Sequence, residues 1–225
     1  MQTRIVNGNE AFNVTGKALE IDGSLVWPFV IGQEETTELL EENLEMDDRD
    51  VGSIIAESLN QNALEIFESL RKEHADDAFE EEDDWKEVLG EWPNGIASKQ
   101  GLTLNTNILN GGLLSSVAIG YASVQENWQI PAFLKYGNWN DCPPAEVHCS
   151  VHRYWSERYG ARIVGVSNDV IECVVDKPPT TQEDAMELAM QQYAYCYDIV
   201  EQGTETVSNL AATLLNGRNW YFWWD

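Results

Sequence analysis

Residues 143–179 read PPAEVHCSVHRYWSERYGARIVGVSNDVIECVVDKPP, and this stretch decides the fold. Pro143 and Pro144 favour a helix start, apolar and aromatic residues then recur with a helical period, and Gly160 is typical of a helix end. The segments ARIVGV and VIECVV are rich in Val and Ile, and Ser, Asn and Asp separate them as in a hairpin turn. The stretch therefore predicts a helix followed by two antiparallel strands.

Downstream of this stretch the pattern predicts two further helices and a last strand. Thr180 and Glu183 are spaced as a capping box ahead of a helix that reaches Cys196. A second helix follows Gly203 and ends at residues 216–217. The ending NWYFWWD has apolar residues on both faces of an extended chain, so we predict a central or well-covered strand.

Upstream of residue 100 the chain predicts a hairpin and then helices. The segment LEIDGSLVWPFVIG reads as two strands around Asp22-Gly23, a dipeptide that suits a type I′ turn. A short amphipathic helix is expected after Thr36, and Asp50 is placed to cap a longer one that runs to about His74. Residues 60–62 are expected to interrupt it. The fold class is therefore α+β, with a mixed sheet, helices packed on it and an acidic, mainly helical N-terminal half.

The charge of the chain is strongly negative and unevenly distributed. Among its 225 residues, 39 Asp and Glu oppose 13 Lys and Arg, which gives a net charge of −26. This balance excludes a basic nucleic-acid binder. Most of the acids precede residue 100, and the composition changes there. We therefore predict an acidic N-terminal region, 1–100, and a C-terminal α/β domain, 101–225.

The compartment can also be predicted from the composition. The N-terminus lacks the uninterrupted apolar stretch of a secretory signal, and the uncharged residues 100–125 carry too many polar groups to cross a bilayer. Four cysteines are too few for a disulfide scaffold. We therefore expect a soluble cytoplasmic protein that binds neither a membrane nor nucleic acid directly.

The second half resembles a known family. The segment PAFLKYGNWNDCPPAEVHCSVHRYWSERYGA, the segment CYDIVEQGTETVSNLAATLL and the ending WYFWWD are together similar to the bacterial domain-of-unknown-function 4253 family, over about residues 128–225. The resemblance implies a bacterial protein without an established activity. By analogy, some small bacterial proteins of similar genomic style are immunity proteins that neutralise toxins.

Two groups around the predicted helix could carry chemistry. His148 and His152 stand four apart, which places both imidazoles on one helix face, as in zinc-binding helices. Cys142 precedes the helix, where the dipole lowers a thiol pKa, and His148 is in reach as a base. The alternative for each group is structural, with the histidines as buried hydrogen-bonding groups and Cys142 in a rigid turn.

Carboxylates in the family motifs are further candidates. Asp198 and Asp225 lie next to aromatic residues, where burial would raise a carboxyl pKa. The structural alternative is that Asp198 sets a helix end and Asp225 is the charged terminus. No cofactor is expected, because DDRD at 47–50 lacks the ligand spacing of a calcium loop and no Lys-Ser or Lys-Thr follows the glycines at 111–112.

The acidic surface is the strongest functional signal. If residues 34–50 are helical, their nine carboxylates give one charge per about 3 Å, close to the phosphate spacing of a nucleic-acid strand. Such a surface would attract a basic protein. The alternative is solubility or salt adaptation. The residues predicted to bind a partner are Glu34, Glu35, Glu38, Glu41, Glu42, Asp47, Asp48, Asp50, Asp83 and Asp84.

The leading hypothesis is a bacterial interaction protein of the inhibitor or immunity type. It would bind a basic partner, such as a nuclease-type toxin, through the acidic half. A second hypothesis is an enzyme or metal-binding protein around Cys142, His148 and Asp198, and a third is a nucleic-acid mimic. The sequence favours binding over catalysis.

Overall fold

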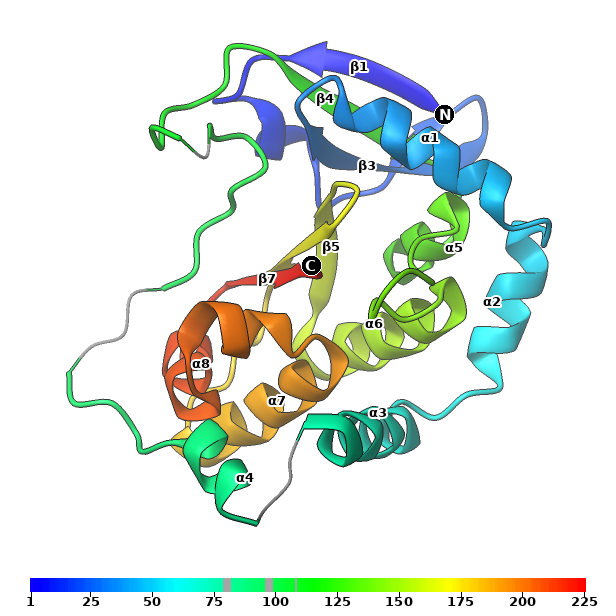
Figure 1. The fold of residues 1–225 in the computed structure, drawn as a ribbon. Helices are drawn as coiled ribbons and strands as arrows, with labels where there is room; N and C mark the ends of the chain where they lie inside the picture. Colours follow the sequence, from blue (N-terminus) through cyan, green and yellow to red (C-terminus); the bar gives the residue numbers. More distant parts are fainter. Residues whose placement is uncertain (79–81, 96–98, 108) are drawn as a thin grey trace.

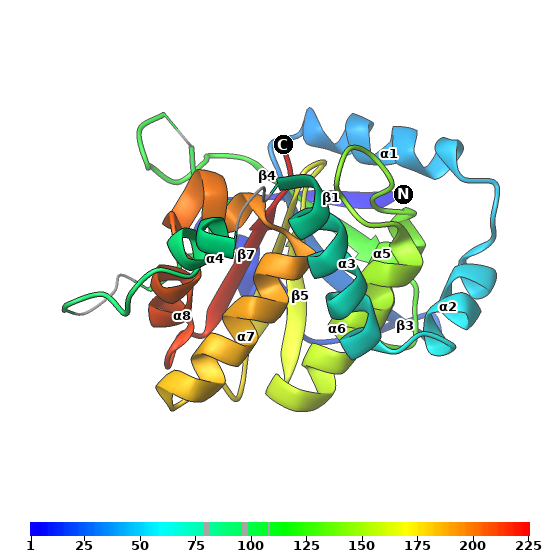
Figure 2. The same ribbon diagram turned by 60° about the horizontal axis from the view of Figure 1, so that its bottom comes forward.

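The computed structural model describes residues 1–78, 82–95, 99–107 and 109–225, and Figures 1 and 2 show it from two sides. The described strands form one seven-stranded mixed sheet in the order β1-β4-β3-β5-β6-β7, with β2 paired to β3. The mixed α+β class is confirmed. The strands are β1 (Gln2–Val6), β2 (Leu19–Ile21), β3 (Ser24–Gly32), β4 (Val117–Ala122), β5 (Ala161–Val166), β6 (Val170–Val175) and β7 (Asn219–Trp223).

Strand β3 lies at the centre of the sheet. It pairs antiparallel with β4 and parallel with β5, where Val30 faces Gly165. Its residues are buried on both faces from Pro28 onward, which explains its nearly continuous apolar sequence. Asp22 and Gly23 connect β2 to β3 with φ angles of 51° and 80°, so the predicted type I′ turn is confirmed.

The helices lie around the sheet as Figure 1 shows, and α6 and α7 cover one of its faces. Trp155 of α6 is fully buried at the centre of this layer, stacked on Phe222 of β7 at 5.4 Å between ring centroids. The helices are α1 (Thr36–Met46), α2 (Val51–Leu59), α3 (Ala63–Ala78), α4 (Glu82–Leu89), α5 (Ile130–Leu134), α6 (Ala145–Tyr159), α7 (Gln182–Tyr195) and α8 (Val207–Leu214).

The predicted helix and hairpin of the deciding stretch are confirmed. Helix α6 begins after Pro144 and ends at Gly160, whose φ is 62° and whose amide donates to the Ser156 carbonyl at 2.9 Å. Strands β5 and β6 follow and pair antiparallel around the turn at residues 167–169. Local sequence therefore determines this unit.

The opposite face of the sheet has an irregular cover. A short 3-10 helix, Ala11–Val14, packs on it together with Leu104 and Leu114 of an irregular segment (described residues 99–107 and 109–116), and they form a small core with Val30, Val117 and Ile119. Glu172 of β6 is fully buried on this side and accepts hydrogen bonds from the amide and hydroxyl of Thr103. Glu172 thereby anchors the irregular segment to the sheet.

The acidic N-terminal half packs against the second half of the chain and contributes strands to the same sheet. In Figure 1, α1, α2 and α3 form an arc around α5 and α6. Asp50 caps α2 by accepting from the Ser53 amide at 3.0 Å, and α2 ends at Leu59, so the predicted cap and interruption are confirmed. The change of composition at residue 100 does not divide the sheet, because β3 from before it lies between β4 and β5 from after it.

Three sequence expectations differ from the structure. The cap of α7 is Thr181, which accepts from the Asp184 amide, so the predicted capping box of Thr180 and Glu183 was wrong by one residue. Strand β7 lies at a sheet edge, with one face buried and the face of Tyr221 and Trp223 only half-buried. Strands β1 and β4 were not predicted.

Candidate functional site

The loop that carries the motif YGNWNDCPP, residues 135–144, has an unusual backbone and is called the motif loop below. Lys135, Gly137, Asn138 and Asn140 all have positive φ angles, between 42° and 96°. Each such residue other than glycine costs about 1–2 kcal/mol, and such conformations persist only where the surroundings hold them. Strained segments of this kind cluster at functional sites. The motif loop is therefore a candidate functional site.

Close packing holds the motif loop. The Asn138 amide donates to the Cys142 carbonyl at 3.1 Å, and the Cys142 amide donates to the Trp139 carbonyl at 2.9 Å. At Gly137, a Cβ atom would lie 1.8 Å from the Pro143 carbonyl oxygen and 2.7 Å from His148 Nε2. Only glycine fits this position.

Behind the motif loop lies a buried chain of polar side chains. His148 Nε2 is 3.4 Å from Cys142 Sγ, and His148 Nδ1 is hydrogen-bonded to the Tyr195 hydroxyl. The same hydroxyl lies 3.1 Å from His152 Nε2, and His152 Nδ1 is 3.8 Å from Cys173 Sγ. The structure thus brings the candidates Cys142 and His148 together, and Tyr195 joins His148 to His152.

Burial determines the protonation of this chain. It holds the pKa of His148 well below the ordinary value and lowers that of His152 to about 3. Burial also raises the pKa of the Cys142 thiol. Both histidines are therefore neutral at pH 7 and Cys142 is a thiol, the opposite of the thiolate and imidazolium pair that a cysteine nucleophile uses.

We expect the thiols of the folded protein to resist alkylation. All four cysteines are free and buried, and burial raises the pKa of each thiol. Iodoacetamide at about pH 8 should modify none of them in native protein within minutes and all of them in urea, because the reactive species is the thiolate. Mass spectrometry of the products measures this. Rapid native labelling of Cys142 would favour the catalytic hypothesis instead.

Asp198 and Asp225 are joined to each other by a hydrogen bond. Asp198 is 6% exposed; its Oδ1 accepts from Gln202 Nε2 at 2.8 Å and its Oδ2 accepts from the Asp225 amide at 3.1 Å. Asn140 of the motif loop donates to the Asp225 carbonyl at 2.8 Å. These bonds tie the last residue to the motif loop and to the end of α7, a structural role.

The metal candidates His148 and His152 both bond to Tyr195, as described above. Among the residues that the structure describes, no three His, Cys, Asp or Glu side chains are grouped closely enough to hold a metal ion. The spacing of four between the two histidines places both on the helix face that contacts the Tyr195 hydroxyl, to which both are hydrogen-bonded.

A cavity of about 530 Å³ opens on one side of the motif loop, and Asp141 and Cys142 are among its lining residues. His74 of α3 lines the same cavity, stacked on Tyr197 at 4.1 Å between ring centroids, and its Nε2 is 2.8 Å from Glu201 Oε1. The Tyr197 hydroxyl donates to Asp141. The acidic half and the motif loop therefore meet at this cavity.

The predicted acidic residues divide into engaged and free groups. Glu41 pairs with the N-terminal amine at 3.1 Å, and Asp50 is occupied as the α2 cap. Asp48 is exposed. Asp83 and Asp84 lie outside the side chains that the structure describes. The remaining acids, Glu34, Glu35, Glu38 and Glu42, are exposed and make no ion pair with a described residue.

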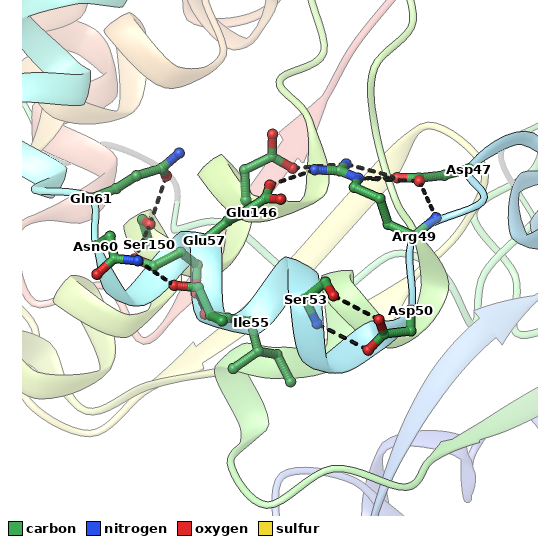
Figure 3. A network of polar contacts seen from close by, with 12 residues as sticks. Asp47, Arg49, Asp50, Ser53, Ile55, Glu57, Asn60, Gln61, Glu146 and Ser150 are labelled. Atoms are coloured by element: carbon green, nitrogen blue, oxygen red, sulfur yellow. Dashed lines mark hydrogen bonds and ion pairs between the residues drawn. The ribbon is translucent and has the colours of Figure 1, made fainter.

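Asp47 belongs to a network around Arg49 (Figure 3). The guanidinium of Arg49 contacts Asp47 at 2.7 Å, Glu57 at 2.6 Å and Glu146 of α6 at 3.0 Å. The hydrogen bonds from Arg49 lower the pKa of Asp47. Because Glu146 comes from α6, the network fastens the acidic half to the second half of the chain.

A second cavity, of about 240 Å³, lies between α1 and the motif loop. Leu39 and Glu42 of α1 form one wall, and Lys135 and Trp139 of the loop form another. Leu39 is 46% exposed, while the next residue, Leu40, is fully buried and anchors α1 to the core. Lys135 donates to the carbonyls of Leu44 and Asp47 and so fixes the end of the helix. Glu42 thus lies beside an exposed leucine on a fixed helix, and Glu34, Glu35 and Glu38 are near Leu39 in the chain.

Residues 118–225 match the model of a family described as domain of unknown function (DUF4253). This part of the chain is a DUF4253 domain. The match begins with β4, upstream of the motif segments on which the resemblance rested. No curated protein and no solved structure matches the chain. Among the described residues, no helix is long and apolar enough to cross a membrane.

The DUF4253 domain does not complete its sheet by itself. Strand β3 comes from before residue 118, yet it separates β4 from β5 of the domain. Sequence reasoning missed this, and it also missed Tyr195, His74 and the contacts of Arg49. Apart from Asp47, which is two positions from Arg49, their hydrogen-bond partners lie between 8 and 127 positions away in the chain, so no local pattern could identify them.

Proposed function

We propose that this protein is a binding protein of the inhibitor type that captures a basic protein partner on the exposed face of α1. A toxin of the nuclease kind has the required charge. The observation that carries the proposal is the group Glu34, Glu35, Glu38 and Glu42, which are exposed, free of ion pairs with described residues and within five positions of the exposed Leu39, with Glu42 lining the same cavity as Leu39. An apolar centre with a charged rim is the usual anatomy of an interface.

The local energetics support this function over plain solubility. Glu38 and Glu42 stand four apart on α1, and like charges at that spacing destabilise a helix by about 0.2–0.5 kcal/mol. Glu42 also lies toward the C-terminal half of α1, where the helix dipole does not favour an anion. A solubilising charge could stand anywhere on the surface. Here Glu38 and Glu42 are kept on a helix that Leu40 and Lys135 hold in place, which lowers the entropy cost of binding.

The other two hypotheses receive less support. Catalysis by Cys142 requires a thiolate, whereas the thiol is buried and its pKa is raised. A nucleic-acid mimic needs a continuous row of free carboxylates, whereas Glu41, Asp47 and Asp50 are occupied by contacts within the chain.

We expect removal of four charges on and just before α1 to slow association with the partner at least about tenfold at low salt, because steering raises association rates by about 10–1,000-fold. The variant replaces each of Glu34, Glu35, Glu38 and Glu42 with Gln. Purified basic nuclease-type toxin domains serve as the panel, and surface-based kinetics at several salt concentrations provide the rates. The rate for the unaltered protein should fall as salt rises.

A matched variant separates the α1 face from net charge. Glu65, Glu68, Glu87 and Glu91 are exposed on α3, on α4 and just after it, so their replacement by Gln removes the same charge elsewhere. At about 0.15 M salt this control should change the rate by less than about twofold, because the Debye length is then about 8 Å and exposed charges farther than that from the interface are screened. Equal losses in both variants would refute binding through α1, as would a panel in which no member binds.

A further inference from the structure

Two aromatic residues of the family's terminal motif face away from the main helical layer. Tyr221 and Trp223 stand two apart on β7, so their side chains lie on the same side of the sheet. Both are half-buried, unlike the fully buried Trp220 and Phe222 on the other side. They line a cavity of about 560 Å³ and also a second cavity of about 320 Å³. We call these two residues the aromatic platform.

The larger cavity lies where open α/β sheets bind ligands. Its lining includes Ile31 and Gly32 at the end of β3 and Ser167 just after β5, and these two strands are parallel neighbours. Ligands of such sheets bind outside the carboxyl ends of parallel strands. Described residues of the irregular segment, 103–107 and 111–114, supply the opposite wall. The volume lies within the range of small-molecule sites.

The smaller cavity is lined in part by a segment with irregular helical geometry. A π-helical turn, Val200–Thr204, follows α7 and supplies Gln202, Gly203 and Thr204 to its lining. Turns of this type are rare and occur frequently at functional sites. The two sequence motifs YDIVEQGT and FWWD therefore converge at the aromatic platform, although their residues are apart in the chain.

Free polar groups around the platform are uncharged. The side chains of Tyr221, Asn168, Gln33 and Gln100 line these cavities and make no hydrogen bond with a described residue. Burial raises the pKa of Tyr221 to about 12, so its hydroxyl is a donor at neutral pH. These groups can form directed hydrogen bonds with a ligand.

Charged groups at the platform are acidic and already satisfied. Asp169 accepts from Ser167 at 3.0 Å and from the Trp223 indole at 3.1 Å, and Asp198 accepts from Gln202 and from the Asp225 amide. No Lys, Arg or His occurs among the described residues that line either cavity. A phosphate would therefore meet negative potential without a counter-charge.

We propose that the aromatic platform binds a small uncharged ring that carries hydroxyl groups, as in a nucleoside or a sugar. The ring would stack on Tyr221 and Trp223, and its hydroxyls would bond to the free amides and the Tyr221 hydroxyl. Aromatic faces accept flat ring faces, and neutral polar groups at the rim set orientation. This inference does not depend on the basic partner proposed above.

Calorimetry and ligand-observed NMR with named probes test the proposal. The nucleoside arm uses adenosine and cytidine, the sugar arm uses glucose and N-acetylglucosamine, and AMP is the charged counterpart of adenosine. At least one neutral probe should bind saturably with a Kd of about 1 mM or tighter. If the nucleoside arm binds, AMP should bind at least about fivefold more weakly than adenosine, because of the carboxylates. The arm that responds identifies the source of the ring.

Two variants assign the binding to the platform. Tyr221→Phe removes only the free hydroxyl and should weaken binding about threefold to tenfold, and Trp223→Ala should weaken it at least about tenfold by removing a stacking surface. Tyr121→Phe is the control, because Tyr121 is half-buried on β4 and lines neither cavity. Circular dichroism checks that each variant folds. Tyr221→Phe keeps the ring and its packing, so its result stands even if Trp223→Ala does not fold.

The outcomes that overturn the proposal are distinct. If no neutral probe binds saturably at concentrations up to about 10 mM, the aromatic platform is not a binding site for such rings. Binding that is equal in Tyr221→Phe, Trp223→Ala and the unaltered protein would place the ligand elsewhere. Binding of AMP as tight as that of adenosine would contradict the charge argument.

Discussion

Replacing Gly137 with Ala should prevent folding of the motif loop and destabilise the whole protein by more than about 4 kcal/mol, a loss comparable to the total stability of many domains. The φ angle of Gly137 is 96°, and an added Cβ would lie 1.8 Å from the Pro143 carbonyl oxygen. Neither neighbour can move easily, because Pro143 precedes α6 and His148 is bonded to Tyr195. Urea unfolding followed by circular dichroism measures the change.

A second glycine separates the clash from the backbone conformation. Gly23 has a similar φ of 80°, but a Cβ there would meet nothing within 4 Å. Gly23→Ala should therefore cost only about 1–2 kcal/mol, the price of a left-handed alanine. If the two variants lose the same stability, the close packing of Gly137 against Pro143 and His148 is not what holds the motif loop.

Mild acid should destabilise the protein through its buried histidines. His148 and His152 are neutral in the fold, with pKa values held below the ordinary 6.5 by burial. The unfolded chain therefore binds more protons below about pH 6.5, so the stability is complete above that pH and is lost as the pH falls. Two such groups remove at most about 2.7 kcal/mol per pH unit, and about 3 kcal/mol between pH 6.5 and 5, because each is half protonated at pH 6.5 in the unfolded chain. Urea unfolding across this range measures the slope.

One buried carboxyl group acts in the opposite direction. Burial raises the pKa of Glu172, so its contribution is present at low pH and is lost as the pH rises. The variant Glu172→Gln removes this opposing effect, and its slope between pH 6.5 and 5 should be at least as steep as that of the unaltered protein. NMR of the imidazole protons provides a direct check: signals of His148 and His152 that titrate near pH 6.5 in the folded state would contradict the burial argument.

The motif loop and the buried histidines belong to one structural unit. The motif loop packs through Gly137 onto His148, and His148 reaches Tyr195 of α7. Asn140 binds the chain terminus, and Lys135 binds the end of α1. The loop is therefore a junction between the acidic helix and the DUF4253 domain. A partner bound on α1 would contact an element whose position this junction determines.

Local patterns predicted much of the fold. The helix of residues 145–159, the strands on either side of residues 167–169 and the turn at Asp22-Gly23 depend on proline, glycine and short-range periodicity. The cap at Thr181 was misplaced by one residue because Thr180 and Thr181 are equally suitable caps, and only the backbone decides which residue leaves the helix. Strand β1 was missed because its residues from Gln2 to Ile5 are exposed and carry no apolar alternation.

The candidate site was predicted only in part. Cys142 and His148 are six residues apart across a helix start, so their contact could be anticipated from spacing. Whether Cys142 and His148 form a reactive pair or an uncharged buried pair depends on Tyr195 and on the buried core residues packed around them. These residues come from other parts of the chain. Desolvation is a property of the whole packing, and no motif encodes it.

By itself, the sequence determined the helices and turns, the net charge of −26 and the resemblance of the second half to DUF4253, because composition and short-range order carry this information. The tertiary structure alone decided that β3 lies inside the domain's sheet and that Glu34, Glu35, Glu38 and Glu42 make no ion pair with a described residue, while Asp47 pairs with Arg49. It also decided that Cys142 and His148 are uncharged. These properties arise from contacts between residues far apart in the chain, which form only when the elements pack together and exclude water.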